Sequence, residues 1–195
     1  VEASLRRIAH FDYWSEKVRR SVLLDAKADL LVFGNAERQI CEIAHRLARR
    51  EPVADITDVR GTAFMVRTAP EGFFEIDSTE VDRPGRIDEH INPYQSTSEQ
   101  AAGQGTTCTR EEGGTVVAMP ASRRVVLPPR DKTVVRLPAY EQVKSDPVLY
   151  AHANRVLHLE TNPGNARALV QAHGSGATAR DVWITAPPIP LTTAE

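Results

Sequence analysis

The sequence predicts a mixed α/β fold, and three stretches carry this prediction. Residues 28–33 (ADLLVF) form a continuous apolar run that ends at Gly34-Asn35, and residues 40–47 place apolar side chains at helical spacing. Residues 59–76 are rich in β-branched and aromatic side chains. A continuous apolar run is typical of a buried strand, and the i, i+3, i+4 spacing is typical of an amphipathic helix. The chain therefore combines strands with helices.

The N-terminal part, residues 1–52, is expected to form an α/β unit. We expect residues 2–20 to be helical with a break near 10–14, and residues 21–25 to form a short strand or a packed turn. Residues 28–33 are predicted to be a buried strand of a parallel sheet, followed by a helix that ends before Pro52. The apolar stripe of this helix consists of Ile40, Ile43, Ala44 and Leu47.

The middle of the chain contains two stretches of different composition, residues 53–94 and 95–124. Within the extension at 53–94, residues 59–67 are predicted to pair with 73–76 as an appended β-hairpin across the Pro70-Glu71-Gly72 turn. Residues 95–124 contain mainly Ser, Thr, Gln, Gly and Ala. Such a stretch buries too little apolar surface to offset its ordering entropy, so we expect a disordered linker.

The C-terminal segment, residues 125–195, is predicted to be largely helical. A strand is expected near 133–137, and Asp146-Pro147 has the pattern of a helix N-cap followed by proline at the first helical position. A second helix is expected over 165–173, then a strand at 181–185 and an extended, proline-rich exit.

Composition excludes several classes of function. There are 24 basic and 26 acidic residues, so no overall positive field attracts nucleic acid or an anionic membrane surface. No apolar run is long enough to span a bilayer. Cys41 and Cys108 are far apart, which gives neither a disulfide framework nor the spacing of a zinc or iron–sulfur site. We expect a cytoplasmic protein without nucleic-acid or membrane partners.

Two groups of residues are candidates for a site. The turn Gly34-Asn35-Ala36-Glu37 follows a strand and begins a helix, where parallel α/β sheets bind ligands. It could equally be a tight turn with an N-capping Asn35 and a favourable Glu37. The second group is His152, His158 and Asn162, in a segment dense in polar side chains. The two histidines are six residues apart and point about 120° from each other on one helix, so they are not a zinc pair.

Three stretches resemble a known family. They are EASLRRIAHFDYWSEKVRRSVLLDAKADLLVFGNAE, LPAYEQVKSDPVLYAHANRVLHLETNPGNARALVQAHG and DVWITAPPIPLTTAE, and they are similar to the N-terminal region of YgiQ-like radical SAM proteins. More loosely, residues 28–51 resemble the last strand–helix unit of cobalamin-binding-like (flavodoxin-like) domains. The acidic turn of those domains is Gly34-Asn35-Ala36-Glu37 here, and their cobalamin-ligating Asp-x-His-x-x-Gly motif is absent. The resemblance therefore implies part of a cobalamin-binding-like fold. It does not imply that a corrinoid is bound.

The resemblance also implies what the chain lacks. In the full family a downstream Cys-x-x-x-Cys-x-x-Cys motif holds a [4Fe–4S] cluster that binds S-adenosylmethionine, and this motif is absent here. We therefore expect no cofactor, metal or catalytic residue in this chain. We expect an internal piece of a longer polypeptide, since Val1 is already in a helical pattern and Thr192 with Glu195 has capping-box spacing.

Three roles remain open from the sequence. The chain could be an accessory region that caps the missing radical SAM core or shapes its substrate pocket. It could be a stand-alone module for a nucleotide-like or corrinoid ligand at the Gly34 turn, or a module that binds another protein. Under the first role, the polar face around His152, His158 and Asn162, with Gly34-Asn35, is expected to be exposed and to meet the core.

Overall fold

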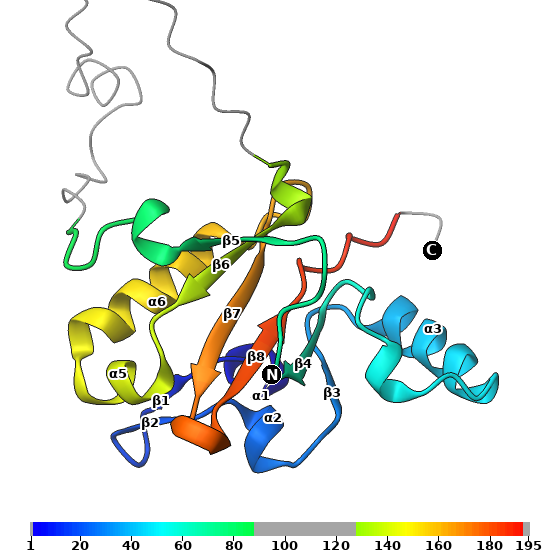
Figure 1. Ribbon diagram of the computed structural model, residues 1–195, viewed down its shortest axis with the longest axis horizontal. Helices are drawn as coiled ribbons and strands as arrows, with labels where there is room; N and C mark the ends of the chain where they lie inside the picture. The colour runs from blue at the N-terminus through cyan, green and yellow to red at the C-terminus, as the bar shows by residue number, and fades with distance from the viewer. Residues whose placement is uncertain (1, 88–127, 193–195) are drawn as a thin grey trace, which may run out of the picture. The chain divides into compact units, whose positions relative to one another are not determined.

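The computed structural model describes residues 2–87 and 128–192, and the elements below belong to one compact unit. A six-stranded mixed sheet has the strand order β3-β4-β8-β7-β6-β5, and a separate two-stranded sheet is formed by β1 and β2 (Figure 1). The mixed α/β class that the sequence predicts is confirmed. The predicted linker at 95–124 lies outside the described residues.

The elements have the following bounds. The strands are β1 His10–Asp12, β2 Lys17–Arg19, β3 Leu30–Val32, β4 Thr62–Val66, β5 Phe74–Asp77, β6 Thr133–Leu137, β7 Ala168–His173 and β8 Arg180–Ile184. The α-helices are α1 Glu2–Leu5, α2 Val22–Asp25, α3 Glu37–Ala48, α5 Tyr140–Ser145 and α6 Pro147–Leu159. Short 3-10 turns are η1 Val53–Asp55, η2 Ser78–Glu80, η3 Arg130–Lys132 and η4 Gly176–Thr178.

The helix predicted over residues 2–20 is wrong beyond Leu5. After α1 the chain forms the antiparallel hairpin β1–β2, in which Phe11 is paired with Val18. The stretch at 21–25 is the short helix α2 rather than a strand, because Ser21 caps it by accepting a hydrogen bond from the backbone N–H of Leu23.

The strand at 28–33 exists, but its predicted parallel and buried setting is wrong. β3 is an edge strand that pairs antiparallel with β4, and its three residues are only half-buried. The helix after it is confirmed as α3. Within its predicted stripe, Ile43 is buried while Ile40 and Leu47 are exposed.

The predicted hairpin between 59–67 and 73–76 is also wrong. β4 pairs with β3 and β8, whereas β5 pairs parallel with β6 at the other side of the sheet. Residues 67–73 therefore cross the intervening strands. Phe73 at the end of this connection packs edge-to-face on Trp183 of β8, with 5.0 Å between ring centroids, so the crossing segment covers apolar surface of the sheet.

The C-terminal segment is partly as predicted. α6 begins at Pro147, and the carboxylate of Asp146 accepts from the N–H groups of Val148 and Leu149 as expected of an N-cap. The strands at 133–137 and 180–184 are also confirmed. The helix predicted over 165–173 is instead the central strand β7, which pairs with β6 and β8.

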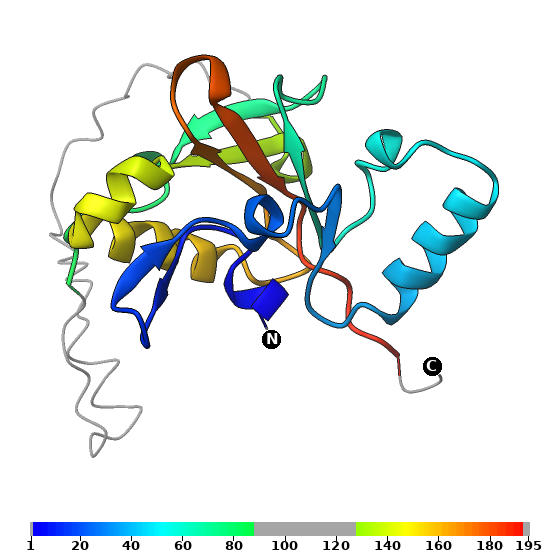
Figure 2. The same cartoon turned by 90° about the horizontal axis from the view of Figure 1, so that it is seen from below.

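The core follows the register of the sheet. One row of paired residues runs through all six strands, and it consists of Leu31, Ala63, Ile184, Leu169, Val135 and Ile76. These side chains pack with Ile8, Leu23 and Val156 from the N-terminal segment and α6. Figure 2 shows these covering elements on one side of the sheet. The opposite face carries a second cluster around Phe64, Val170 and Trp183.

Candidate functional site

Two turns and the last part of the described chain meet at one end of strands β3, β4 and β8. Gly34 follows β3, Gly61 precedes β4, and residues 185–192, here termed the exit segment, follow β8. Both glycines have positive φ, +77° and +75°, which side chains rarely adopt. A Cβ at either position would lie 3.0 Å from an atom of Pro188. The two turns therefore need glycine for their backbone conformation and for contact with the exit segment.

Hydrogen bonds fix the exit segment at this place. The N–H of Gly61 donates to the carbonyl of Ala186 (2.8 Å), and Nε of Arg60 donates to the carbonyl of Pro187 (3.0 Å). The same guanidinium donates through Nη2 to the carbonyl of Pro163, in the turn after α6. Arg60 thus connects the exit segment with the turn that contains Asn162. We call the Gly34–Glu37 turn, the Arg60–Gly61 turn, residues 162–165 and the exit segment together the exit edge.

Most of the sequence-predicted site residues lie along this edge. Gly34, Asn35 and Glu37 are exposed in the turn before α3, and the N–H of Gly34 donates to Oγ of Ser4 (3.2 Å). The predicted N-cap role of Asn35 is not observed, because α3 is preceded by Ala36 without a side-chain cap. Asn162 is exposed and its Oδ1 accepts from the N–H of Gly164. His158 is exposed in the last turn of α6.

His152 is separate from these residues, and its predicted exposure is wrong. It lies on the inner face of α6 with a fully buried side chain, and its Nε2 shares a hydrogen bond with Oγ of Ser78 (3.1 Å). Its Nδ1 lies 4.0 Å from Oδ2 of Asp82, which also binds Nε of Arg155. Burial lowers the pKa of His152, against the opposing effect of Asp82 and Asp77. This buried, neutral imidazole connects α6 to η2 through its hydrogen bond with Ser78, so its role is structural.

A crevice lies beside His152 at the carboxyl ends of β5 and β6, where parallel strands commonly bind ligands. It encloses about 270 Å³ and is lined by Ser78, His152 and Arg136 among others. Arg136 is already bound by the carboxylates of Glu75 (2.8 Å) and Asp181 (2.9 Å). The main polar groups of the crevice therefore already have partners: His152 pairs with Ser78, and Arg136 pairs with two carboxylates outside the crevice lining.

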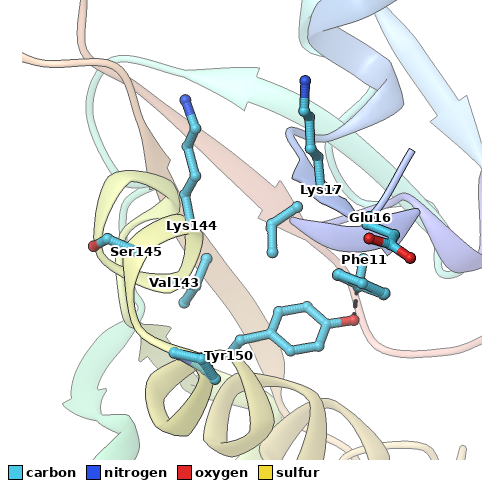
Figure 3. A pocket seen from close by; sticks show the side chains of 9 residues that line it. Phe11, Glu16, Lys17, Val143, Lys144, Ser145 and Tyr150 are labelled. Atoms are coloured by element: carbon cyan, nitrogen blue, oxygen red, sulfur yellow. Dashed lines mark hydrogen bonds between the residues drawn. The ribbon is translucent and has the colours of Figure 1, made fainter. Parts of the chain in front are cut away.

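A second groove lies between the β1–β2 hairpin and helices α5 and α6 (Figure 3). It also encloses about 270 Å³, and Phe11, Val18, Val143 and Tyr150 contribute its apolar surface. The hairpin is held there because the N–H of Phe11 donates to the hydroxyl of Tyr150 (2.9 Å). Figure 3 shows the side chains of Lys17 and Lys144 extending from the two sides of this groove.

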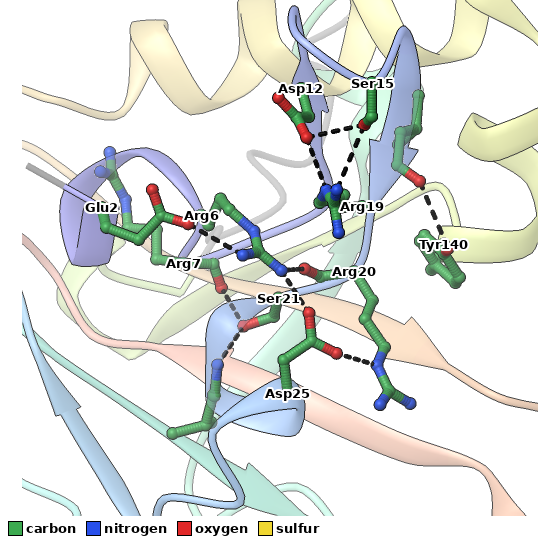
Figure 4. A network of polar contacts seen from close by, with 12 residues as sticks. Glu2, Arg6, Arg7, Asp12, Ser15, Arg19, Arg20, Ser21, Asp25 and Tyr140 are labelled. Carbon is green, nitrogen blue, oxygen red and sulfur yellow. Dashed lines mark hydrogen bonds and ion pairs between the residues drawn. The ribbon is translucent and has the colours of Figure 1, made fainter.

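The base and tip of the hairpin are fixed by the polar network in Figure 4. Asp12 accepts hydrogen bonds from Oγ of Ser15 and Nε of Arg19, both at 2.7 Å, and from the N–H of Trp14. These contacts, Ser15 first, lower the pKa of the Asp12 carboxyl to about 2. Near α2, Asp25 binds both Arg6 and Arg20. Two acidic residues thus hold the N-terminal segment in place.

Sequence reasoning missed the functional interest of Arg60 and of the hairpin. Arg60 has no local signal, because its partners lie more than one hundred residues further along the chain. The hairpin did leave a signal. The aromatic residues at 11–14 interrupt the helical pattern, and Asp12 stands beside a hydroxyl residue at 15 that can close a turn.

The side chains of the described residues do not fit an iron–sulfur cluster or another metal centre. Among residues 2–87 and 128–192, no three His, Cys, Asp or Glu side chains converge to hold a metal ion, and Cys41 is exposed on α3. No helix within the same ranges combines the length and apolar character needed to cross a membrane.

Comparison with known proteins identifies the family. The Radical SAM N-terminal family matches residues 1–195. The chain is 59% identical to a UPF0313 protein of Pseudomonas aeruginosa and 56% identical to one of Chromobacterium violaceum, covering 100% of this chain and 26% of each relative. It is 51% identical to UPF0313 protein YgiQ of Escherichia coli K12, again over 100% of this chain and 25% of the relative. No solved structure matches. The chain thus spans about a quarter of the length of its relatives, and it belongs to the radical SAM N-terminal family as a YgiQ-like member.

Proposed function

We propose that this chain is an accessory region of a radical SAM enzyme, which packs against the catalytic core of the same polypeptide and helps to shape the substrate pocket. In this proposal the core supplies the [4Fe–4S] cluster and binds S-adenosylmethionine. This chain supplies no catalytic residue and acts in the cytoplasm without nucleic-acid or membrane partners.

The exit edge is the observation that carries the proposal. Arg60 and the two glycine turns hold the exit segment in one position, so the polypeptide that follows would leave from a defined point. Figure 2 shows this segment passing the start of α3. The exposed Ile40 and Leu47 of that helix give a partner apolar surface close by. The family match and the quarter-length coverage support a partner within the same polypeptide.

A ligand module at the Gly34 turn is less well supported. In a phosphate-binding turn the glycine leaves room for a ligand to approach the backbone. At Gly34 that room is occupied by Pro188, which lies close enough to touch an added Cβ. Exposed polar groups around a fixed exit suit a protein surface better than a small-molecule pocket.

The test uses the full-length protein with an anaerobically reconstituted cluster. The variants Asn35→Arg, within the exit edge, and His158→Ala, four residues before its Asn162, change exposed positions, so they are expected to leave folding intact. We expect a several-fold lower rate of S-adenosylmethionine cleavage to 5′-deoxyadenosine, at unchanged iron content. The matched control is Ser175→Arg, an exposed position after β7, at the opposite end of the strands from the exit segment. Full activity in both variants, or an equal loss in Ser175→Arg, would contradict the proposal.

A further inference from the structure

We infer that the tip of the β1–β2 hairpin and the groove beside it form a docking site for the rest of the same polypeptide, outside residues 1–195. This inference rests on the proposed function, because both require the core to lie against this region. It adds a second contact, remote in sequence from the exit segment, and it names the residues that would anchor the core.

The hairpin tip presents an unusual amount of aromatic surface to solvent. The side chains of Tyr13 and Trp14 are 79% and 92% exposed, and Phe11 at the mouth of the groove is 40% exposed. Trp183, the other tryptophan of the chain, is buried. Large aromatic side chains are the residue types that anchor protein interfaces, and a cluster of them on the surface commonly marks a contact site.

The tip is also held in a single conformation. The carboxylate of Asp12 accepts hydrogen bonds from the N–H of Trp14 (3.1 Å) and the hydroxyl of Ser15 in the turn. Nε of Arg19, on the opposite strand, donates to the same carboxylate. The rings of Tyr13 and Trp14 pack edge-to-face, with 6.2 Å between their centroids. A pre-organised anchor loses little conformational entropy when it docks, so it binds more tightly than a flexible loop with the same side chains.

The groove defines the chemistry of the occupant. Its surface is mainly apolar, from Phe11, Val18, Val143 and Tyr150. The side chains of Lys17 and Lys144 stand at its sides, and these two positive charges outnumber the single carboxylate of its lining, Glu16. An apolar segment fits the floor, and a carboxylate on that segment would pair with the lysines. We therefore expect a stretch with apolar side chains and at least one Asp or Glu.

Two observations favour the same polypeptide over a separate protein. About three quarters of the length of the relatives lies outside the matched part, so a large tethered neighbour is present at high local concentration. In addition, the hairpin, α1 and the exit segment lie on the same side of the six-stranded sheet in Figure 2. A core that contacts the exit edge from this side can therefore also reach the hairpin.

The first experiment measures the exposure of Trp14 in the full-length protein. The protein is labelled with 5-fluorotryptophan, the resonances of positions 14 and 183 are assigned with Trp14→Phe and Trp183→Phe, and the fluorine shift between H₂O and D₂O is recorded. We expect a shift near zero for Trp14, as for the buried Trp183. A Trp14 shift as large as that of free 5-fluorotryptophan would overturn the inference.

A second experiment identifies the occupant. A photo-crosslinking phenylalanine analogue replaces Tyr13 in the full-length protein, and the crosslinked peptides are mapped by mass spectrometry. We expect one dominant product within the same polypeptide, with its second peptide outside residues 1–195 and containing Asp or Glu. The charge reversal Lys17→Glu with Lys144→Glu should reduce its yield several-fold. Products only between separate molecules, or no defined product, would overturn the inference. If those results coincide with lost activity in the exit-edge variants, only the hairpin contact fails and the proposed function stands.

Discussion

His173 is a buried imidazole that stays neutral at physiological pH. It ends β7, stacks on Tyr140 with 5.4 Å between ring centroids, and neither ring nitrogen has a hydrogen-bond partner in the described part of the chain. Burial lowers its pKa to about 4, although the carboxylate of Glu141 works in the opposite direction. The unfolded chain takes up a proton near pH 6.5, whereas the folded chain does so only near pH 4. Folding therefore releases a proton from this group in the window between them.

The first prediction follows from this linkage. The free energy of unfolding should be greatest above pH 6.5 and should fall by roughly 3 kcal/mol as the pH drops to about 4, because each pKa unit corresponds to about 1.4 kcal/mol. His173→Phe keeps a ring against Tyr140 and removes the titration. Denaturant unfolding at several pH values should show a flatter profile for the variant between pH 6.5 and 4. Parallel profiles for the two proteins would mean that His173 is accessible to protons in the folded state.

The two histidines of α6 give the second prediction. His152→Ala removes a buried side chain that bonds Ser78, so we expect a loss of about 2 kcal/mol of unfolding free energy. His158→Ala, six residues further along the same helix, changes an exposed side chain and should stay within about 0.5 kcal/mol. Chemical denaturation of both variants tests this prediction. Equal losses of unfolding free energy would contradict the burial of His152 and the exposure of His158.

At the scale of elements, local patterns predicted those elements whose signals are contained in a few residues. Asp146 and Pro147 indicate the start of α6, and β-branched and aromatic residues indicate β8. The sequence of β7, ALVQAH, is compatible with either a helix or a strand in isolation, so local patterns wrongly predict a helix there. Its strand form comes from pairing with β6 and β8, a tertiary effect that overrides propensity.

The same distinction applies to the candidate site. The Gly34 turn could be found because a glycine between an apolar run and a helix is a local signal. His152 could not be told from His158, since which face of α6 is buried depends on where η2 lies. Arg60 could not be found at all, because its partners reach it only when the sheet brings distant turns together.

The third prediction concerns β3. Leu31 belongs to the apolar row that crosses the sheet and packs against the main core, although β3 is an edge strand. Leu31→Asp would place an unpaired carboxylate there and should lower the melting temperature strongly or prevent folding. Ile40→Asp on the exposed side of α3 is the matched control and should leave this chain nearly as stable as before. Thermal unfolding followed by circular dichroism distinguishes them, and an unchanged melting temperature for Leu31→Asp would show that β3 does not contribute to the core.

At the scale of the whole molecule, the fourth prediction is that the chain assembles no iron–sulfur cluster. Cluster assembly needs several thiolates at one place, and the sequence has two cysteines at distant positions. After anaerobic incubation with iron and sulfide and removal of excess reagents, iron should remain far below one equivalent and should not change in a Cys41→Ser, Cys108→Ser variant. Stoichiometric iron that disappears in the double variant would require a site formed by both cysteines.

The position of β8 has a consequence for synthesis on the ribosome. Among the described residues, β8 is the last strand of the sheet in chain order, yet it lies between β4 and β7 and joins the β3–β4 pair to the β5–β6–β7 group. Until residue 184 has left the exit tunnel, the nascent chain can hold two separate half-sheets, each with an unpaired edge. Unpaired edges are sites of aggregation and chaperone binding, and in this region they become paired only after β8 has emerged. A stop codon or a ribosomal stall just before β8 would therefore release both halves unjoined, rather than a slightly shortened version of the same molecule.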